Sequence, residues 1–248
     1  MSRADAAGAS PATTLGRPRL HHRTIGSTNA RAQELAIAGA PHGTIVTARE
    51  QSAGRGRQGR AWATPPGTTL AVTTILRDPP PLLTLAAGLA VADVARALDA
   101  QGREPRIKWP NDVLLDGRKL AGILAEGRLQ DGWAVLGIGI NVATRQDDFP
   151  PELAARATTL GREPEAVEQA LTLLLAALER WLAAPLNELL DAFRAVDALL
   201  GREIAWEGGR GTAAGIADDG RLRVRTDDGV EQLLDAGEVH LGALPPAR

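Results

Sequence analysis

Glycines and arginines alternate in the segment Gly-Arg-Gly-Arg-Gln-Gly-Arg, residues 54–60. Glycine lets the backbone fold back at little steric cost. Arginine presents a planar, permanently charged fork that suits phosphate or carboxylate. The segment therefore predicts an anion-binding loop. A solvent-exposed arginine-rich turn, with or without a contact to RNA, is the alternative that composition alone leaves open.

The same segment matches the pattern G-x-G-x-x-G through Gly54, Gly56 and Gly59, as dinucleotide-binding sites do. In those sites the last glycine opens a helix, and the N-terminus of that helix binds the pyrophosphate. Here the run Pro-Pro-Gly at 65–67 prevents a helix, and a strand-like pattern follows at once. The sequence therefore argues against a dinucleotide-binding fold.

The chain has only two lysines among its 28 basic residues, Lys108 and Lys119, and both lie in one short stretch. The dipeptide Asp-Gly at 116–117 predicts a two-residue hairpin turn between two strands. That turn places Asp112 opposite Ala121 and on the same face as Lys119, about 7 to 8 Å away. The pair could flank a phosphate group or a metal ion. An exposed salt bridge is the alternative.

Gly137, Gly139 and Asn141 alternate along the next predicted strand. Glycine weakens a strand interior, so two glycines there indicate that another group approaches the backbone closely. Tight packing against a helix would explain them equally well. Ser27, Thr28 and Asn29, taken alone, are typical of a helix cap.

Composition limits the class of protein that could hold these residues. The 248 residues include 44% hydrophobic and 23% charged residues, which is typical of a folded protein of one or two domains. The net charge of -2 provides no overall attraction to nucleic acid or anionic lipid. Cysteine is absent, which excludes disulfides and thiolate sites and predicts a cytoplasmic protein. No apolar run is long enough to span a membrane.

The pattern along the chain predicts the elements that position these residues. Residues 1–20 are expected to be a disordered tail, too short for a DNA-binding winged helix. Helices are expected from Ser27 to Gly39 and over 82–100, 163–183 and 186–200, and strands over 44–47 and 69–76, followed by an antiparallel meander through Val142. Short strands at 204–206, 212–216, 222–225 and 230–234 predict a small β-barrel.

Several of these motifs occur in an order that resembles the biotin protein ligases, over most of residues 21–241. The segments that carry the resemblance are Ser27-Thr28-Asn29, 51–62, 108–112, 118–124 and Gly137 to Asn141. Each motif alone is a moderate signal, and their order with compatible secondary structure is a strong one.

The resemblance implies an α+β fold like that of class II aminoacyl-tRNA synthetases. Its catalytic domain, residues 21–200, would have a mixed, largely antiparallel central sheet flanked by helices. Residues 201–248 would form an SH3-like C-terminal domain. Biotin and MgATP would form biotinyl-5′-AMP, and a lysine of a biotin carboxyl carrier protein of a biotin-dependent carboxylase would then accept the biotin.

The resemblance also implies which residues bind the substrates. Biotin would contact Ser27, Thr28, Asn29, Gln51, Gly54, Arg55, Gly56, Arg57, Lys119 and Gly122. ATP would contact Arg55, Arg57, Gln58, Gly59, Arg60, Trp62, Asn111, Lys119 and Asn141. The catalytic residues would be Lys119, Arg55 and Arg57, and Asp112 would hold Mg²⁺. The arginine loop would be mobile in the empty enzyme and would order over the adenylate.

Other functions remain open at this level. A lipoate or octanoate ligase could share the architecture, and a non-enzymatic RNA-binding protein could use the arginine loop. The resemblance favours a monofunctional ligase with no DNA-binding domain and no membrane partner, and the sequence does not decide between a monomer and a homodimer. Gln58 occupies a position that is often basic in the family, which bears on how tightly the adenylate is retained.

Overall fold

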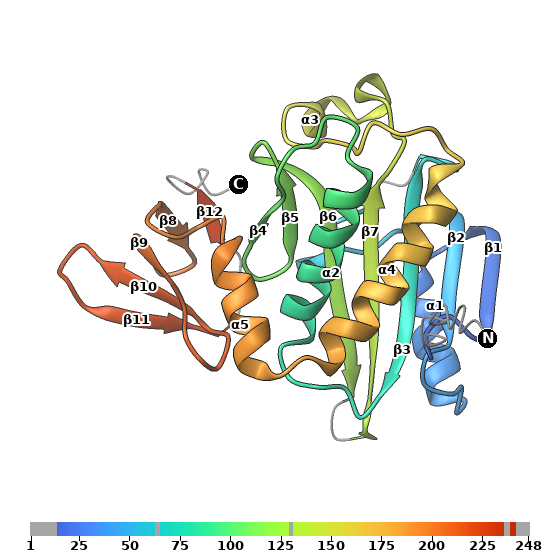
Figure 1. Cartoon of the computed structure of the whole chain (residues 1–248), viewed down its shortest axis with the longest axis horizontal. Helices are drawn as coiled ribbons and strands as arrows, with labels where there is room; N and C mark the ends of the chain where they lie inside the picture. Colours follow the sequence, from blue (N-terminus) through green and yellow to red (C-terminus); the bar gives the residue numbers. More distant parts are fainter. Residues whose placement is uncertain (1–13, 63–64, 129–130, 236–238, 242–248) are drawn as a thin grey trace, which may run out of the picture.

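The structure, a computed structural model, describes residues 14–62, 65–128, 131–235 and 239–241. Its larger part is a seven-stranded sheet in the order β1-β2-β3-β7-β6-β5-β4 (Figure 1). Its strands are β1 (Arg19–Ile25), β2 (Ile45–Gln51), β3 (Thr69–Arg77), β4 (Arg106–Lys108), β5 (Asp112–Leu115), β6 (Arg118–Arg128) and β7 (Trp133–Asn141). β1 and β2 run parallel and the other neighbours are antiparallel, which confirms the predicted mixed sheet.

Helices cover both faces of this sheet. They are α1 (Thr28–Ile37), α2 (Leu83–Leu98), α3 (Pro151–Ala154), α4 (Ala166–Ala183) and α5 (Leu186–Ala195). α2 and α4 pack on each other over one face, where the larger hydrophobic core lies, and α1 packs on β2, β3 and β7 over the other face (Figure 1). The α1 face is only partly covered, because one ten-residue helix lies over it.

The central strand β7 shows how the two faces differ. Successive side chains of a strand point to opposite faces. Leu136, Ile138 and Ile140 enter the core beneath α2 and α4. Trp133 and Val135 face α1, and the same alternation brings Gly137 and Gly139 to that face beyond the helix. The glycines therefore leave a shallow area on the sheet that other side chains can approach closely.

The N-terminal segment corrects one prediction. Residues 1–13 lie outside the described residues, but residues 14–20 do not form the disordered tail expected of them. Leu15 is buried, and β1 begins at Arg19 and pairs with β2. The Arg19 guanidinium also binds both carboxylate oxygens of Glu168 on α4 at 2.7 Å. The sequence did not indicate this edge strand, because its side chains are exposed or half-buried and show no alternation with buried positions.

The last helix is shorter than predicted. α5 ends at Ala195, and it does not continue to Leu200. Residues 196–198 leave the helix because they pair with β4: Ile107 donates its backbone N–H to the Val196 carbonyl at 2.8 Å, and Ala198 donates to the Ile107 carbonyl at 2.9 Å. Pairing with the edge of the sheet thus replaces the last helical turn.

The C-terminal strands form a separate antiparallel sheet in the order β11-β10-β9-β8-β12. They are β8 (Glu203–Trp206), β9 (Gly209–Ile216), β10 (Leu222–Thr226), β11 (Glu231–Leu234) and β12 (Val239–Leu241). Four strands agree with the predicted small β domain, and β12 was not predicted. The domain boundary at residues 200 and 201 stays a prediction.

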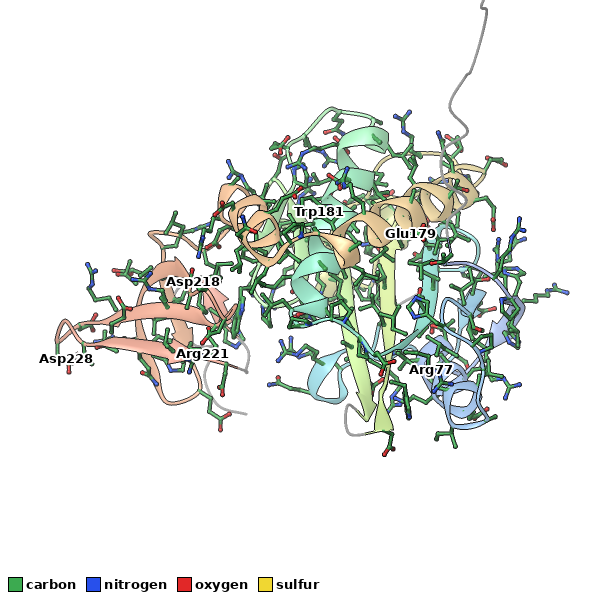
Figure 2. All side chains as sticks on the ribbon, turned by 60° about the horizontal axis from the view of Figure 1, so that its bottom comes forward. Arg77, Glu179, Trp181, Asp218, Arg221 and Asp228 are labelled. Carbon is green, nitrogen blue, oxygen red and sulfur yellow. The ribbon has the colours of Figure 1, made fainter. Side chains whose placement is uncertain are left out.

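Specific contacts attach this sheet to the larger one. The indole Nε1 of buried Trp109 donates to the Gly220 carbonyl at 3.0 Å, from the β4–β5 connection to the β9–β10 turn. Arg194 on α5 donates to Asp218 in the same turn at 2.7 Å, and Figure 2 labels Asp218 beside α5. Among the described residues, no helix combines the length and the apolar character needed to cross a membrane.

Candidate active site

Three adjacent strands provide the floor of the site. On the α1 face, at the N-terminal end of that helix, β3, β7 and β6 each present small or medium-sized side chains in register. They are Ala71 and Thr73, Gly139 and Gly137, and Gly122 and Leu124. The period of two along each strand brings all six to one face. The result is a flat area beyond the N-terminus of α1.

The two β7 glycines are required by what lies on them. A Cβ added at Gly137 would lie 2.0 Å from Oδ1 of Asn29, and one added at Gly139 would lie 2.4 Å from the ring of Trp62. Real Cβ atoms essentially never make non-bonded contacts this short. Trp62 of the 54–62 segment lies on Gly139, as the prediction of a closely approaching group requires, whereas Asn29 of α1 lies on Gly137, so packing against a helix, the alternative, accounts for Gly137.

The polar end of the site is formed where α1 begins and β2 ends. Ser27 caps α1 by accepting from the backbone N–H of Ala30 at 3.4 Å. Gln51 Oε1 accepts from the backbone N–H of Thr28 at 2.8 Å and from its hydroxyl at 3.0 Å. The predicted cap and the predicted cluster of Ser27, Thr28 and Gln51 are therefore the same structure. It presents hydroxyl and amide groups at the sheet.

Asn29 extends this polar end into a buried network. Its Oδ1 accepts from the Thr73 hydroxyl at 2.7 Å, and its Nδ2 donates to Glu126 at 2.8 Å. Glu126 lies 3.9 Å from the guanidinium of Arg55, which is about half exposed. Sequence reasoning missed Glu126. Its carboxylate lies beside Arg55, which lines the smaller of the cavities described below.

The glycine–arginine segment forms a small hairpin over the floor. The backbone N–H of Gly56 donates to the Arg60 carbonyl at 2.7 Å, and that of Trp62 donates to the Gly54 carbonyl at 2.9 Å. Gln58 and Gly59 have positive φ at its tip. β3 follows, with no helix opened by Gly59, so this segment is not built as a dinucleotide site. Its geometry places Trp62 over Gly139.

Arg57 is the arginine of this hairpin that reaches the β4–β5 connection. Its guanidinium donates to Asn111 Oδ1 at 3.2 Å, and Asn111 Nδ2 donates to the Ile123 carbonyl at 2.9 Å. Burial lowers the pKa of Arg57, and the nearby charge of Asp112 opposes that shift. Arg57 is thus a half-buried cation held by an amide. Arg60, in contrast, donates to exposed Gln58 at 3.2 Å.

Asp112 and Lys119 meet directly. The Lys119 ammonium lies 2.7 Å from Asp112 Oδ1 and 5.6 Å from the centre of the Trp62 ring. The shared face was predicted, and the two side chains form the salt bridge that was the alternative, although it is half-buried and not exposed. The predicted opposite residue was wrong. Asp112 lies opposite Gly122, and not Ala121, because Leu120 is an additional residue in β6 at a bulge. The Asp-Gly turn at 116–117 has positive φ at both positions, as predicted.

Asp112 is the described residue best suited to a divalent cation. Its buried Oδ1 has the Lys119 ammonium as a charged partner at 2.7 Å, and it is the carboxylate that lines the larger cavity. Among the described residues, no three His, Cys, Asp or Glu side chains gather as a metal site. Mg²⁺ is commonly held by one or two carboxylates together with substrate phosphates. The residues present therefore fit a cation that is bound by Asp112 on one side and by the phosphates of a nucleotide on the other.

Two cavities meet at this point. The smaller, of about 50 Å³, lies over the floor and reaches Ser27, Thr28, Asn29 and Gln51. The larger, of about 790 Å³, extends between the β4–β5 connection, α3 and β12. The residues that line both are Gly56, Arg57, Trp62, Asn111 and Lys119. The junction thus carries two cations.

Most predicted site residues line one of the cavities. Arg55 and Gly122 line the smaller one, and Gln58, Arg60, Asp112 and Asn141 line the larger one. Gly54 and Gly59 line neither. A Cβ at Gly54 would lie 2.3 Å from the Trp62 carbonyl, so Gly54 lets the two arms of the hairpin close.

The larger cavity also holds Lys108, which sequence reasoning singled out without giving it a site role, and Arg156 and His240, which it missed. Burial lowers the pKa of Lys108, with Lys119 and Arg60 acting in the same direction. Burial also lowers the pKa of His240, and Lys108 adds to that shift. The lysine stretch was the signal for Lys108. Arg156 and His240 come from distant segments and carry no local signal.

Known proteins share both parts of the chain. Residues 22–142 match the Biotin/lipoate A/B protein ligase family, and residues 193–242 match the Biotin protein ligase C terminal domain. A Biotin--[acetyl-CoA-carboxylase] ligase of Paracoccus denitrificans is 39% identical over 239 residues, which cover 87% of this chain and 97% of that protein.

A larger relative and a solved structure are similar to this chain over most of its length. The Bifunctional ligase/repressor BirA of Bacillus spizizenii is 35% identical over 247 residues, which cover 92% of this chain and 75% of that protein. The structure of a biotin protein ligase from Aquifex aeolicus in complex with biotin and ATP superposes with a TM-score of 0.76 at 27% identity, over 92% of this chain and 99% of that chain. The chain therefore belongs to the biotin protein ligase family.

Proposed function

We propose that this chain activates biotin with ATP to biotinyl-5′-AMP and pyrophosphate, and then transfers biotin to a lysine of a carrier protein. The observation that carries the proposal is the junction of the two cavities, where Arg57 and Lys119 lie between a small polar-ended site and a large open one. A ligase that joins a carboxylate to a phosphate needs cations at that point.

The smaller cavity suits the biotin head group. The ureido ring of biotin needs both donors and acceptors, which Ser27, Thr28, Asn29 and Gln51 supply at the start of α1. An acyl chain of lipoate or octanoate needs an apolar channel at that end instead. The polar end therefore favours biotin over these acids.

In the first step a carboxylate oxygen of biotin attacks the α-phosphorus of ATP. The bond from that phosphorus to the bridging oxygen breaks, and pyrophosphate leaves with the bonding electrons. Two anionic groups must approach each other, and charge builds on the phosphoryl oxygens. The Lys119 ammonium and the Arg57 fork would contact these oxygens, and a fixed cation stabilises such charge strongly.

Asp112 would hold Mg²⁺ together with the nucleotide. The ion would neutralise phosphate charge when bound. When no other cation competes for its carboxylate, Asp112 also positions the Lys119 ammonium, whose Nζ lies 2.7 Å from Asp112 Oδ1. The same carboxylate thus serves the metal and the lysine.

Asp112→Asn tests this role. The amide has no charge to offer Mg²⁺, so we expect the Mg²⁺ concentration for half-maximal pyrophosphate exchange to rise on the order of tenfold or more. The measurement is a Mg²⁺ titration at fixed biotin and ATP. Asp116→Asn is the matched control, because Asp116 is exposed in the turn of the same hairpin and asparagine tolerates its positive φ of 49°. An unchanged Mg²⁺ dependence in Asp112→Asn would show that Asp112 does not bind the metal.

In the second step the amine of a carrier lysine attacks the carbonyl carbon of the adenylate. The carbonyl carbon–oxygen bond to AMP breaks, AMP leaves, and the amine loses a proton. Until then the mixed anhydride must be kept from water. The 54–62 hairpin covers the floor, and its Trp62 ring leaves only about 50 Å³ beneath it. It must therefore open to admit biotin and close over the adenylate.

The partner that this chemistry implies is the biotin carboxyl carrier domain of a biotin-dependent carboxylase, in a cytoplasmic setting. A monofunctional enzyme without DNA binding stays our prediction, and a monomer and a homodimer are both compatible with it. No feature of the described residues favours an RNA-binding role over the ligase.

The proposal is tested with the purified chain, biotin and MgATP. We expect biotinyl-5′-AMP in the quenched reaction by mass spectrometry, and a mass increase on the carrier domain after that domain is added. The proposal would be refuted if no adenylate formed, or if the carrier gained mass only in reactions that lacked ATP.

A further inference from the structure

The backbone of Lys119 is held on both sides. Towards β5 it pairs with Leu114. On its other side β7 has ended, and residues 156–158 take the place of that strand. The Lys119 backbone N–H donates to the Arg156 carbonyl at 2.7 Å, and its carbonyl accepts from the Thr158 N–H at 2.9 Å. A short piece of chain thus completes the sheet beside Lys119.

The same piece of chain, residues 156–160, also holds Asn141 at the end of β7. The Asn141 side chain donates to the Thr158 carbonyl at 2.9 Å. The Asn141 carbonyl accepts from the backbone N–H of Leu160 at 3.0 Å and from the Thr159 hydroxyl at 3.3 Å. Two predicted site residues on different strands therefore depend on one irregular segment.

A buried ion pair fixes that segment. Arg103 donates to Thr158 Oγ1 at 3.1 Å and to the Thr159 carbonyl at 2.7 Å. Its guanidinium also binds Asp99 at 2.6 Å, where the Asp99 side chain is 0% exposed and that of Arg103 is 10% exposed. Asp99 in turn accepts the Arg103 backbone N–H at 2.7 Å. Asp99 thus orients Arg103, which presents its remaining donors to residues 158 and 159.

Asp99 and Arg103 line neither cavity, so they do not touch a ligand there. A buried pair of this kind is weak evidence for stability, because desolvation offsets much of the attraction. Its geometry is specific, however, since one planar fork joins a carboxylate, a hydroxyl and a carbonyl. This is the arrangement expected of a group that fixes position.

We infer that the Asp99–Arg103 pair is a positioning device for the Lys119 ammonium and for Asn141, acting through residues 156–160. The inference rests on the proposed ligase function, because it assigns Lys119 to the reaction. A displacement of about 1 Å at a reacting centre can cost a hundredfold in rate. Arg103 therefore affects kcat at a distance from the substrates.

The two lysines of the chain make a direct test practicable. Selective isotope labelling of lysine gives NMR signals from Lys108 and Lys119 alone. We expect Arg103→Met to shift or broaden the Lys119 side-chain signal, and to lower kcat for biotin-dependent pyrophosphate exchange roughly tenfold to a hundredfold. KM for biotin should change less than about threefold, because the polar end of the smaller cavity is untouched.

Arg103→Lys and Thr158→Val extend the test if Arg103→Met folds poorly. Arg103→Lys keeps the charge and should recover only part of kcat, because the three donors of an ammonium share one nitrogen and cannot match acceptors placed around a planar guanidinium. Thr158→Val removes one acceptor of Arg103 and should lower kcat less than Arg103→Met. The melting temperature of each variant is measured together with its kcat, so that a loss of rate can be separated from a loss of stability.

Arg19→Met is the matched control. Arg19 likewise joins a carboxylate, Glu168, to a threonine hydroxyl, that of Thr47 at 3.1 Å, but it lies on β1 and lines neither cavity. It should change stability and leave kcat and the Lys119 signal as in the wild type. Wild-type kcat and an unmoved Lys119 signal in Arg103→Met would overturn the inference. Absence of exchange in the wild-type chain would instead overturn the ligase function.

Discussion

Lys119→Ala is expected to lower biotin-dependent ATP–pyrophosphate exchange on the order of a hundredfold or more, as loss of a preorganised electrostatic group typically does. The Lys119 ammonium lines both cavities and lies 2.7 Å from Asp112, so its removal takes the compact cation from their junction. The effect should fall on kcat, because charge at the α-phosphate develops in the transition state. The measurement is steady-state exchange with biotin and ATP varied separately.

Lys119→Arg is the comparison variant for this prediction. It retains a positive charge, but a planar fork replaces a point charge beside Asp112 and the Trp62 ring, so recovery should be partial. Melting temperatures close to that of the wild type would show that both variants are folded. Near-normal exchange in folded Lys119→Ala would refute the role of Lys119.

Gly137→Ala is expected to raise KM for biotin by about a hundredfold. The added Cβ would lie 2.0 Å from Asn29 Oδ1, so Asn29 must leave its place between Thr73 and Glu126. Overpacking costs about 1 to 3 kcal/mol, and unpaired buried polar groups add about 1 to 3 kcal/mol. KM for ATP should change little, because Gly137 lines only the smaller cavity.

Gly26→Ala is the matched control for Gly137→Ala. Gly26 directly precedes Ser27, yet a Cβ added there meets no atom within 4 Å. It should therefore leave both KM values near those of the wild type. An unchanged KM for biotin in Gly137→Ala would show that the floor of the smaller cavity is not where biotin binds.

Much of this site could be predicted from sequence because its signals are local. The Asp-Gly turn at 116–117 indicates its hairpin through two residues that accept positive φ. Gly137 and Gly139 indicate close approach because only glycine has no Cβ to displace Asn29 or Trp62. The helix cap at Ser27 follows from side-chain chemistry alone.

The errors arise where distant segments decide the outcome. The bulge at Leu120 moves Asp112 opposite Gly122, and no residue near the turn signals it. α5 ends early because residues 196–198 pair with β4, across a separation of about ninety residues along the chain. Arg156 and the Asp99–Arg103 pair reach the site only through tertiary contacts, which local periodicity does not encode.

The most direct test of the central claim is ATP–pyrophosphate exchange by the wild-type chain, measured separately with biotin, lipoate and octanoate. The polar groups at the start of α1 and the cations at the cavity junction predict exchange that depends on biotin and is far slower with either of the other acids. Exchange with lipoate or octanoate and not with biotin, or exchange with none of the three, would contradict it.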